Sequence, residues 1–215
     1  MTQKPLKIGI IGLSGRMGKS ILLEIGEAQD LEFSPTCEKA NVLIDFSNVS
    51  AVFKNLRLAT NALIPLVVGT TGLGETEWDS LKEASKAIPI LHSNNMSKGI
   101  ALFKNLVKKT AVTLEGNVSI EIIETHHIQK IDSPSGTAIM LKNALPSKIN
   151  VKITSIREGR NIGEHTVRFS NGAEVIELKH FALSRQVFAK GAISASRWLI
   201  KQPPGLYSID DVLEI

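Results

Sequence analysis

The sequence predicts an α/β protein with a parallel-sheet domain and a central α+β domain that has a mostly antiparallel sheet. Up to about residue 91, short apolar runs alternate with amphipathic segments, a pattern typical of a parallel sheet covered by helices. Beyond residue 117 this alternation stops and β-rich runs follow one another. Asn171-Gly172 lies between the last two runs and is a strong hairpin signal.

The composition is that of an ordinary globular protein. With 215 residues, 43% hydrophobic and 21% charged, the chain can bury one large core or two small ones. No apolar run reaches membrane length and residues 1–7 are polar, so we expect neither a leader nor a membrane partner. The net charge of +4 is spread along the chain, which suits small anionic ligands better than nucleic acid. Cys37 is the single cysteine, which fits a reducing cytoplasm.

A strand, a glycine turn and a helix are predicted first. Residues 6–11 are nearly all apolar, as in a buried parallel strand, and residues 19–25 have the pattern of an amphipathic helix. Between them stands G-x-x-G-x-x-G, a spacing that is moderately specific by itself. Glycines there permit a tight turn and a close approach of the backbone to a pyrophosphate at the helix N-terminus. We therefore predict a Rossmann-like domain whose glycine turn contacts a dinucleotide.

The second strand is predicted at residues 31–37, with a proline that makes it an imperfect or edge strand. Glu38 follows 26 positions after Gly12, near the distance expected for an acid that holds the adenosine ribose hydroxyls. Lys39 beside it, with Arg16 in the glycine turn, can instead hold a 2′-phosphate. The alternative is a solvated turn without a binding role. We expect both NADH and NADPH to be used.

The later elements of this domain end in polar turns. They are predicted as strand 42–47, helix 49–62 capped by Ser47 or Asn48, strand 66–68, helix 75–87 and strand 89–91. Gly69-Thr70-Thr71-Gly72 follows the fourth strand, and a doubly wound sheet holds its ligand at the carboxyl ends of its strands. We interpret His92, which follows the fifth strand, as a structural residue.

The central domain is predicted from a helix at 99–112 onward. Its other elements are strand 117–124, helix 138–145 and β-rich runs at 151–157, 164–169 and 174–181. A long helix at 184–200 and an apolar tail from residue 205 are expected to return to the first domain, on which the tail docks. We therefore place the dinucleotide-binding domain at 1–97 and 183–215, and the substrate-binding and oligomerisation domain at 98–182.

Residues 121–137 carry most of the groups suited to chemistry. Pro134 and Gly136 break the chain between a strand and a helix, so these groups lie on a loop held by regular structure. A helix that starts near Gly136 leaves its first N–H groups unpaired, which makes a site for a carboxylate or phosphate. The hydroxyls of Ser135 and Thr137 can add hydrogen bonds.

The same loop offers proton donors. His126 or His127 can donate a proton near neutral pH, and Lys130 offers a second proton or a fixed positive charge. The alternative is a capped helix beside surface histidines. We expect no metal, because adjacent histidines on a strand point to opposite sides and no third ligand stands at metal spacing.

These residues resemble the signature of the 4-hydroxy-tetrahydrodipicolinate reductases (dihydrodipicolinate reductases), E-x-H-H-x-x-K-x-D-x-P-S-G-T-A, which stands here at residues 124–138. The match is long and specific. Other matching segments cover nearly the whole chain: Gly12 to Gly18, Asp45-Phe46-Ser47, Gly69 to Gly72, Arg157-Glu158-Gly159, Gly163 to Thr166, and Gly205 to Leu213.

The resemblance implies an NADH- or NADPH-dependent enzyme. Its cofactor domain is formed by both chain ends, and its central domain binds substrate and builds a homotetramer in the cytoplasm. The implied reaction reduces the dicarboxylate cyclic imine that is made from aspartate semialdehyde and pyruvate, in the diaminopimelate route to lysine.

The resemblance also implies a role for each matching position. His126 matches the proton donor and Lys130 the second proton donor. The groups that hold the substrate carboxylates are matched by His127, Ser135, Gly136 and Thr137. The cofactor contacts are matched by Gly12, Leu13, Ser14, Gly15, Arg16, Met17, Glu38, Gly69, Thr70, Thr71, Ser93, Asn94, Asn95 and Met96.

The chain departs from the family pattern in two short segments. Residues 38–42 lack a helix and a strand that are usually present, and residues 159–163 lack a usual insertion. Met96 and Lys98 also replace the usual phenylalanine and an aliphatic residue.

Two other functions are the alternatives. A non-catalytic dinucleotide-binding sensor needs neither His126 nor Lys130, so their presence argues against it. Another two-domain dehydrogenase, acting on an amino acid or a sugar, is the second alternative. The anion site at residues 135–137 disfavours sugars, which have no carboxylate for it to hold.

Overall fold

The computed structural model describes residues 4–114 and 118–215. Two sequence-based expectations fall partly outside these ranges, namely the polar start of the chain at residues 1–3 and the strand start at residue 117.

The chain divides into two compact units. The first unit runs to Ser97 and resumes at Gln186–Glu214, and the second unit is Lys98–Arg185. The sequence predicts the return to the first unit at residue 183. In the structure it falls a few residues later, where a long helix begins.

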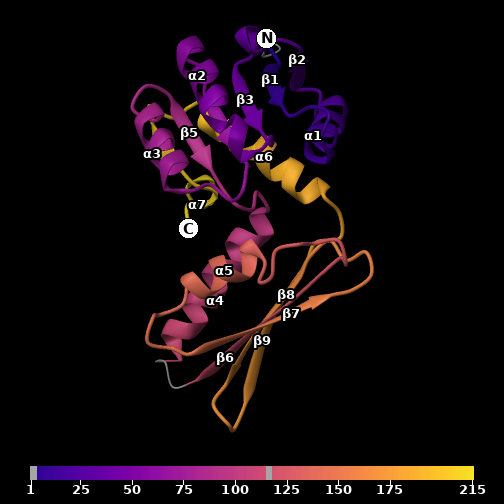
Figure 1. The fold of residues 1–215 in the computed structure, drawn as a ribbon, viewed down its shortest axis with the longest axis vertical. Coiled ribbons are helices and arrows are strands. Elements are labelled where there is room, and N and C mark those ends of the chain that lie inside the picture. Colours follow the sequence, from indigo (N-terminus) through magenta and orange to yellow (C-terminus); the bar gives the residue numbers. More distant parts are fainter. Residues whose placement is uncertain (1–3, 115–117) are drawn as a thin grey trace. The chain divides into compact units, whose positions relative to one another are not determined.

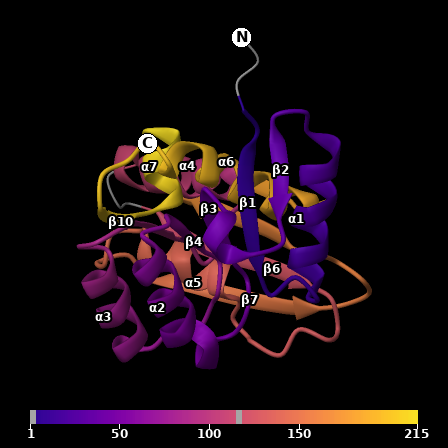
Figure 2. The same ribbon diagram turned by 90° about the horizontal axis from the view of Figure 1, so that it is seen from above.

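Six strands of the first unit form one sheet, in the order β10-β5-β4-β3-β1-β2, and Figure 1 and Figure 2 together label them. The strands are β1 (Leu6–Ile11), β2 (Leu31–Ser34), β3 (Val42–Asp45), β4 (Leu66–Val68), β5 (Pro89–His92) and β10 (Gly205–Tyr207). Each neighbouring pair runs parallel. All residues of β3, β4 and β5 are buried, as expected where both faces of a sheet are covered. The predicted parallel sheet is confirmed.

Helices cover both faces of this sheet. They are α1 (Arg16–Glu27), α2 (Val52–Ala62), α3 (Glu75–Ala84), α6 (Gln186–Leu199) and α7 (Ile209–Leu213), with short 3-10 turns at Cys37–Lys39 and Val49–Ala51. α1 packs beside α6, and α2 packs beside α3. Figure 2 shows α6 and the α2–α3 pair on opposite faces of the sheet. The chain leaves β1 toward β2 and then crosses back to β3, so the strand order reverses at β1 and β3. Such a reversal opens a crevice at the carboxyl ends of the strands.

Helix α1 begins earlier than the predicted 19–25. Its first residue is Arg16, and Gly15 in extended conformation is the N-cap. The last glycine of the turn, Gly18, is therefore inside the helix. A Cβ on Gly18 would lie 2.4 Å from the Gly12 carbonyl oxygen, so only glycine lets the helix sit this close to the turn.

The strand predicted at 42–47 ends at Asp45 in the structure, and two further elements are also shorter than predicted. The strand predicted at 31–37 ends at Ser34, because Pro35 has no N–H to continue the ladder. The helix predicted at 75–87 ends at Ala84, and single turns continue to Ile88.

The chain end completes the first unit, as predicted. β10 pairs with β5 through Gly205, Leu206 and Tyr207, and α7 packs on α6. The apolar character of this tail is explained by that docking.

The second unit is a four-stranded sheet in the order β7-β6-β8-β9, covered by two helices. Its elements are α4 (Lys98–Thr113), β6 (Ser119–His126), α5 (Gly136–Asn143), β7 (Val151–Arg157), β8 (Glu164–Ser170) and β9 (Val175–Phe181). β6 is parallel to β7, and the β6–β8 and β8–β9 pairs are antiparallel. The mostly antiparallel sheet and the hairpin at Asn171-Gly172 are confirmed.

The helices α4 and α5 lie on one face of this sheet (Figure 1). Their apolar side chains meet those of the strands in one core, which includes Ile100, Phe103, Val107, Ile120, Ile122, Ala138, Leu141, Val167 and Phe169. The other face carries polar and charged side chains together with exposed apolar ones, among them Val175 and Phe181. Within residues 4–114 and 118–215, no helix combines the length and apolar character needed to cross a membrane.

Candidate active site

Strand β6 carries two buried polar side chains beyond the apolar core of the second unit. Alternate residues of a strand share a face, so Glu124 and His126 follow Ile120 and Ile122 on the side covered by the helices. Both are buried, with 0% of Glu124 and 7% of His126 exposed. The strand thus sets a carboxylate and an imidazole side by side where little water reaches them.

The Glu124 carboxylate has partners on both oxygens. Oε2 is hydrogen-bonded to Nδ1 of His126. Arg157, on β7, donates from Nη1 to Oε2 at 3.1 Å and from Nη2 to Oε1 at 2.8 Å. The backbone N–H of Ser135 donates to Oε1 at 3.2 Å. Burial alone raises the pKa of Glu124, but the hydrogen bonds, led by that from Arg157, outweigh burial and lower the pKa to about 2. Glu124 is therefore ionised at neutral pH.

The His126 ring is held on several sides. Burial lowers its pKa more than the Glu124 carboxylate raises it, and nearby cations lower it further. The ring of His165, on β8, stands edge-on to it with 5.2 Å between centroids. On the Nε2 side lies Gly163, where a Cβ would come within 3.1 Å of Nε2. The glycine therefore leaves the Nε2 edge uncrowded.

Three histidine rings line up across β6, β8 and β9. His165 is 3% exposed and lies between His126 and His180, whose ring centroid is 6.5 Å away. Burial lowers the pKa of His165 to about 3, so this ring is neutral at pH 7. Within the described residues, neither of its ring nitrogens has a hydrogen-bond partner.

Lys130 lies on the loop after β6 and is paired with Asp132. Nζ donates to both carboxylate oxygens, at 2.7 and 2.8 Å. Burial raises the pKa of Asp132, but Lys130 and backbone hydrogen bonds, including one from Gly136, outweigh it and lower the pKa. Asp132 thus holds the Lys130 ammonium, which is predicted to be a proton donor, and interacts with the Gly136 N–H, which is predicted to hold a substrate carboxylate. Its carbonyl oxygen accepts from Arg157 Nη2 at 2.7 Å, which fixes the loop to β7.

Helix α5 begins at Gly136, as predicted, with Ser135 as its N-cap. The Ser135 hydroxyl accepts from the Ala138 N–H at 3.1 Å, and the residue is 1% exposed. Gly136 is exposed and Thr137 is half-buried at the start of the helix. His127 is expected to contact a substrate carboxylate. It is half-buried, and its backbone N–H donates to the backbone carbonyl oxygen of Asn161 at 2.7 Å.

In the first unit, the glycine turn lies at the carboxyl end of β1. Gly12 has φ +85°, a left-handed conformation that favours glycine, and Gly15 N–H donates to its carbonyl oxygen at 3.0 Å. Leu13 and Ser14 are exposed at the tip of the turn. Arg16 and Met17 belong to the first turn of α1. These features make a helix N-terminus that a pyrophosphate can approach.

The ends of β3 and β4 lie at the same edge of the sheet. Asp45 accepts from the Ser47 N–H and from the Asn55 side chain, each at 2.8 Å, which fixes the turn after β3. Of the two predicted caps, Asn48 is the one observed, because its side chain accepts a hydrogen bond from the Ala51 N–H. Gly69 follows β4, and a Cβ there would lie 2.3 Å from the Phe46 ring.

The remaining cofactor candidates of this edge differ in exposure. Thr70 is buried and Thr71 exposed, and the Thr70 carbonyl oxygen is 3.2 Å from Nε2 of His92. His92 also packs edge-on against Trp78, in keeping with its structural interpretation. The turn from Ser93 to Met96 is closed by the Ser93 hydroxyl, which donates to the Asn95 carbonyl oxygen at 2.7 Å.

Met96 is 1% exposed, and a Cβ on Gly191 of α6 would lie 1.7 Å from its carbonyl oxygen. The structure therefore holds this segment by its backbone, and a cofactor contact there would come from the exposed Asn94 or from main-chain atoms. Glu38 and Lys39 lie apart from these turns in sequence, exposed on the 3-10 turn after β2.

Each unit therefore gathers one group of the predicted residues. The first unit brings together the turns after β1, β4 and β5, and the second unit brings His126, Lys130 and the start of α5 around Glu124. No role is predicted from the sequence for Glu124, Arg157 or Asp132. The spacing of Glu124 and His126 on a strand was a usable signal, since it places them on one face. Arg157 stands in a segment that matches the family, Arg157-Glu158-Gly159, but no spacing links it to Glu124, which lies 33 positions away.

Comparison with known proteins gives the family. The C-terminal dihydrodipicolinate reductase family model matches residues 99–213 and the N-terminal model matches residues 33–96. A 4-hydroxy-tetrahydrodipicolinate reductase of Clostridium novyi (strain NT) is 36% identical, over a match that covers 97% of this chain and 98% of that protein. The chain belongs to the dihydrodipicolinate reductase family. Another reductase, from Bdellovibrio bacteriovorus, is 38% identical over 98% of this chain and 97% of its own length.

Solved structures agree at the level of the fold. A dipicolinate-bound dihydrodipicolinate reductase from Paenisporosarcina sp. TG-14 has a TM-score of 0.74 with 18% identity and covers 95% of this chain and 97% of its own. The fold class and the family expected from the sequence are thus confirmed. Membership of the dihydrodipicolinate reductase family supports the expected function, an oxidoreductase of lysine biosynthesis through the diaminopimelate pathway.

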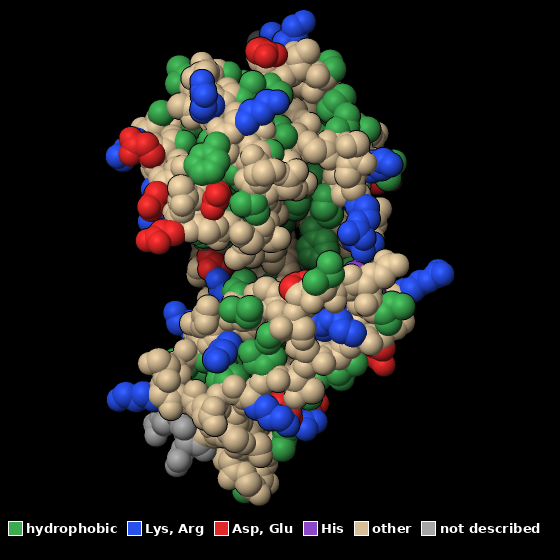
Figure 3. Space-filling model, in the orientation of Figure 1, with side chains coloured by type: hydrophobic (Ala, Val, Ile, Leu, Met, Phe, Trp, Pro, Cys, Tyr) green, Lys and Arg blue, Asp and Glu red, His purple; other side chains and the backbone are tan. Residues whose placement is uncertain are grey.

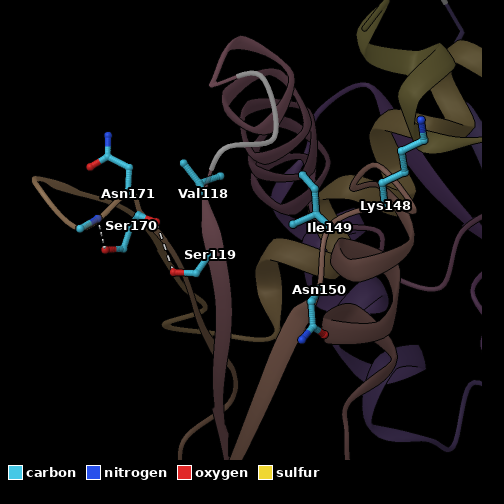
Figure 4. A pocket seen from close by; sticks show the side chains of 8 residues that line it. Val118, Ser119, Lys148, Ile149, Asn150, Ser170 and Asn171 are labelled. Atoms are coloured by element: carbon cyan, nitrogen blue, oxygen red, sulfur yellow. Dashed lines mark hydrogen bonds between the residues drawn. The ribbon is translucent and has the colours of Figure 1, made fainter.

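A pocket of about 560 Å³ lies at the other end of the second unit's sheet (Figure 4). Its lining residues are Val118, Ser119, Lys148, Ile149, Asn150, Ser170, Asn171 and Gly172. Ser119 Oγ donates to the Ser170 carbonyl oxygen at 3.2 Å, so part of its polar lining is already paired. Among the lining residues that the structure describes, Lys148 is the one with a charged side chain, and none of them belongs to the reductase signature. This pocket therefore holds none of the site residues predicted from the sequence.

Proposed function

We propose that this protein reduces 4-hydroxy-tetrahydrodipicolinate to tetrahydrodipicolinate with NADH or NADPH, and that His126 and Lys130 supply the protons. The observation that carries the proposal is the position of His126 beside the start of α5. Glu124 is hydrogen-bonded to both, through Nδ1 of His126 and the N–H of Ser135. A proton donor and an anion-binding helix start are what a dicarboxylate imine requires of its site.

The second unit supplies the substrate side. His127, Ser135, Gly136 and Thr137 are proposed to hold the carboxylates, chiefly through N–H groups at the start of α5, because the Ser135 hydroxyl already caps the helix. Asp132 gives up its contacts to Lys130 and Gly136 when a substrate carboxylate takes its place. Charge that develops on the ring nitrogen during reduction is then stabilised by His126 and the Lys130 ammonium.

The first unit fits a dinucleotide. The left-handed Gly12 and the close seating of α1 at Gly18 allow the backbone to approach a pyrophosphate. The residues proposed to hold the cofactor are Gly12 to Met17, Gly69 to Thr71, and Ser93 to Met96, with Glu38 and Lys39 at the adenosine end. A bound nicotinamide supplies the hydride. Exposed Glu38 suits ribose hydroxyls and exposed Lys39 suits a 2′-phosphate, so we expect both cofactors to be accepted.

Assembly and location are further parts of the proposal. The sheet face opposite α4 and α5 carries exposed Val175 and Phe181 among paired charges, which suits an interface between copies in a homotetramer. Cys37 is a free thiol, in keeping with a reducing cytoplasm. On the face seen in Figure 3, basic and acidic side chains are interspersed, a pattern that suits small anionic ligands.

The test is cofactor oxidation in a coupled assay. The upstream synthase makes the substrate from pyruvate and aspartate semialdehyde, and NADH and NADPH are compared in parallel. We expect turnover with both cofactors and a loss on the order of 100-fold or more in kcat for His126→Ala. Dinucleotide binding without turnover would contradict the proposal and favour a sensor. A preference of several orders of magnitude for one cofactor would contradict dual use.

A further inference from the structure

We propose that Glu124, held by Arg157, is the positioning residue of this reductase: it fixes the orientation and tautomer of His126 and ties that histidine to the substrate-binding turn at Ser135. The inference deepens the proposed function and rests on it.

The tautomer follows from the partner of Nδ1. An ionised carboxylate only accepts hydrogen bonds, so a neutral His126 facing Glu124 Oε2 must carry its hydrogen on Nδ1. Nε2 is then the nitrogen that binds and releases the exchangeable proton. This is the nitrogen beside Gly163, where the missing side chain leaves room. A ring free to rotate would lose both features.

Arg157 holds the Glu124 carboxylate in the position from which it faces His126. Its two N–H···O bonds to Glu124, at 3.1 and 2.8 Å, form the paired geometry that fits a carboxylate best. Because Glu124 is completely buried, the guanidinium also keeps it charged. A protonated Glu124 could donate to His126 and reverse the tautomer.

The other carboxylate oxygen sets the distance between proton donor and substrate. Oε1 accepts from the Ser135 N–H at 3.2 Å, in the residue that caps α5. The same Arg157 donates to the Asp132 carbonyl oxygen at 2.7 Å and so holds the loop that bears Lys130. One buried ion pair therefore connects both proposed proton donors to the anion-binding turn.

The charged and titratable groups around His126 come from four strands and one loop. Glu124 shares its strand, Arg157 is on β7, Lys130 is on the following loop, and His165 on β8 stands before His180 on β9. Glu124 is the one acid among these neighbours, and its charge raises the pKa of His126. Removing that charge must therefore lower the pKa of His126.

The direct test needs no variant of Glu124. The wild-type protein, labelled with ¹⁵N-histidine, is titrated by NMR, and His126 is assigned by the signal lost in His126→Gln. We expect the neutral ring to carry its hydrogen on Nδ1. A neutral ring with the hydrogen on Nε2 would overturn the proposal, whatever the activity of the protein.

Glu124→Gln tests the consequence for catalysis. A glutamine has one acceptor oxygen. The Ser135 N–H and Arg157 Nη2, which both donate to Oε1 in the wild type, keep that oxygen at the Oε1 position. The glutamine NH₂ group then faces His126 and reverses the tautomer. We expect kcat to fall on the order of 100-fold with a much smaller change in substrate KM. The limb of the kcat/KM profile that reports protonated His126 should move to lower pH.

Glu121→Gln is the matched control. Glu121 lies on the same strand, faces the other side of the sheet and pairs with Lys152 of β7 at 2.8 Å, so Glu121→Gln makes the same chemical change on the face opposite His126. We expect its kcat to stay within about threefold of wild type when both are compared in the same oligomeric state. Equal kcat losses in the two variants, or an unmoved pH limb in Glu124→Gln, would overturn the proposal.

The outcome is separable from that of the proposed function. If wild type shows no turnover but His126 has the Nδ1–H tautomer, the reaction assigned above fails while the positioning of His126 stands. If Glu124→Gln does not fold by circular dichroism, Arg157→Lys replaces it. Lysine keeps the charge but lacks the fork, and we expect a loss of about tenfold in kcat. A kcat equal to wild type in that variant would count against the role of Arg157.

Discussion

Replacing Gly18 with alanine tests how closely α1 is seated on the glycine turn. A Cβ there would lie 2.4 Å from the Gly12 carbonyl oxygen and 2.6 Å from Cα of Leu13. Both are backbone atoms, so the helix and the turn must separate by about an ångström to restore ordinary contact. Overpacking of this kind costs about 1–3 kcal/mol.

Gly26 provides a control in the same helix. Nothing lies within 4 Å of a Cβ at this position. Gly26→Ala should raise the free energy of unfolding by up to about 1 kcal/mol, because alanine favours the helix and restricts the unfolded chain. One substitution at two positions of α1 should thus have opposite effects on stability.

Two measurements decide the matter. Urea unfolding gives the free energy of unfolding of each variant, and fluorescence titration gives the dissociation constant for NADH and NADPH. We expect Gly18→Ala to lose stability and to bind dinucleotide at least about tenfold more weakly, because a displaced turn misplaces its N–H groups. A Gly18→Ala protein that is as stable as Gly26→Ala would refute the close seating. A destabilised variant with unchanged affinity would instead refute the turn as the dinucleotide site.

Three further results are expected. Lys130→Ala should lower kcat on the order of 100-fold in steady-state kinetics, whereas a rise in KM alone would make Lys130 a binding residue. Gly191→Ala should lower the urea midpoint, because its Cβ would lie 1.7 Å from the Met96 carbonyl oxygen; an unchanged midpoint would disprove that contact. The free energy of unfolding should decrease as the pH is lowered, and it should do so in two pH ranges. Burial lowers the pKa of His165 to about 3, so the unfolded chain alone takes up that proton below about pH 6.5. Glu124, whose hydrogen bonds outweigh burial and bring its pKa to about 2, adds a further loss below about pH 4.5. His165→Phe should flatten the upper range in urea titrations at successive pH values, and an unaltered slope would contradict the assignment.

The sequence by itself determined the order and type of most elements. Alternating apolar runs predicted the parallel sheet, Asn171-Gly172 predicted the β8–β9 hairpin, and the chain break at Pro134 and Gly136 predicted a helix that starts near Gly136. These signals are local, since they depend on side-chain periodicity and on what each residue does to its own backbone. The loop of residues 124–138 was identifiable for the same reason, because its proton donors and helix start are contiguous.

Tertiary structure decided what sequence spacing does not contain. Gly18 is inside α1 because the helix packs on the Gly12 carbonyl oxygen, and that contact depends on where two segments meet. Arg157 reaches Glu124 only because β7 lies alongside β6, which brings together residues 33 positions apart. Burial is the reason that Glu124 depends on Arg157. A carboxylate withdrawn from water stays ionised only when a partner of opposite charge and fixed hydrogen bonds stabilise it.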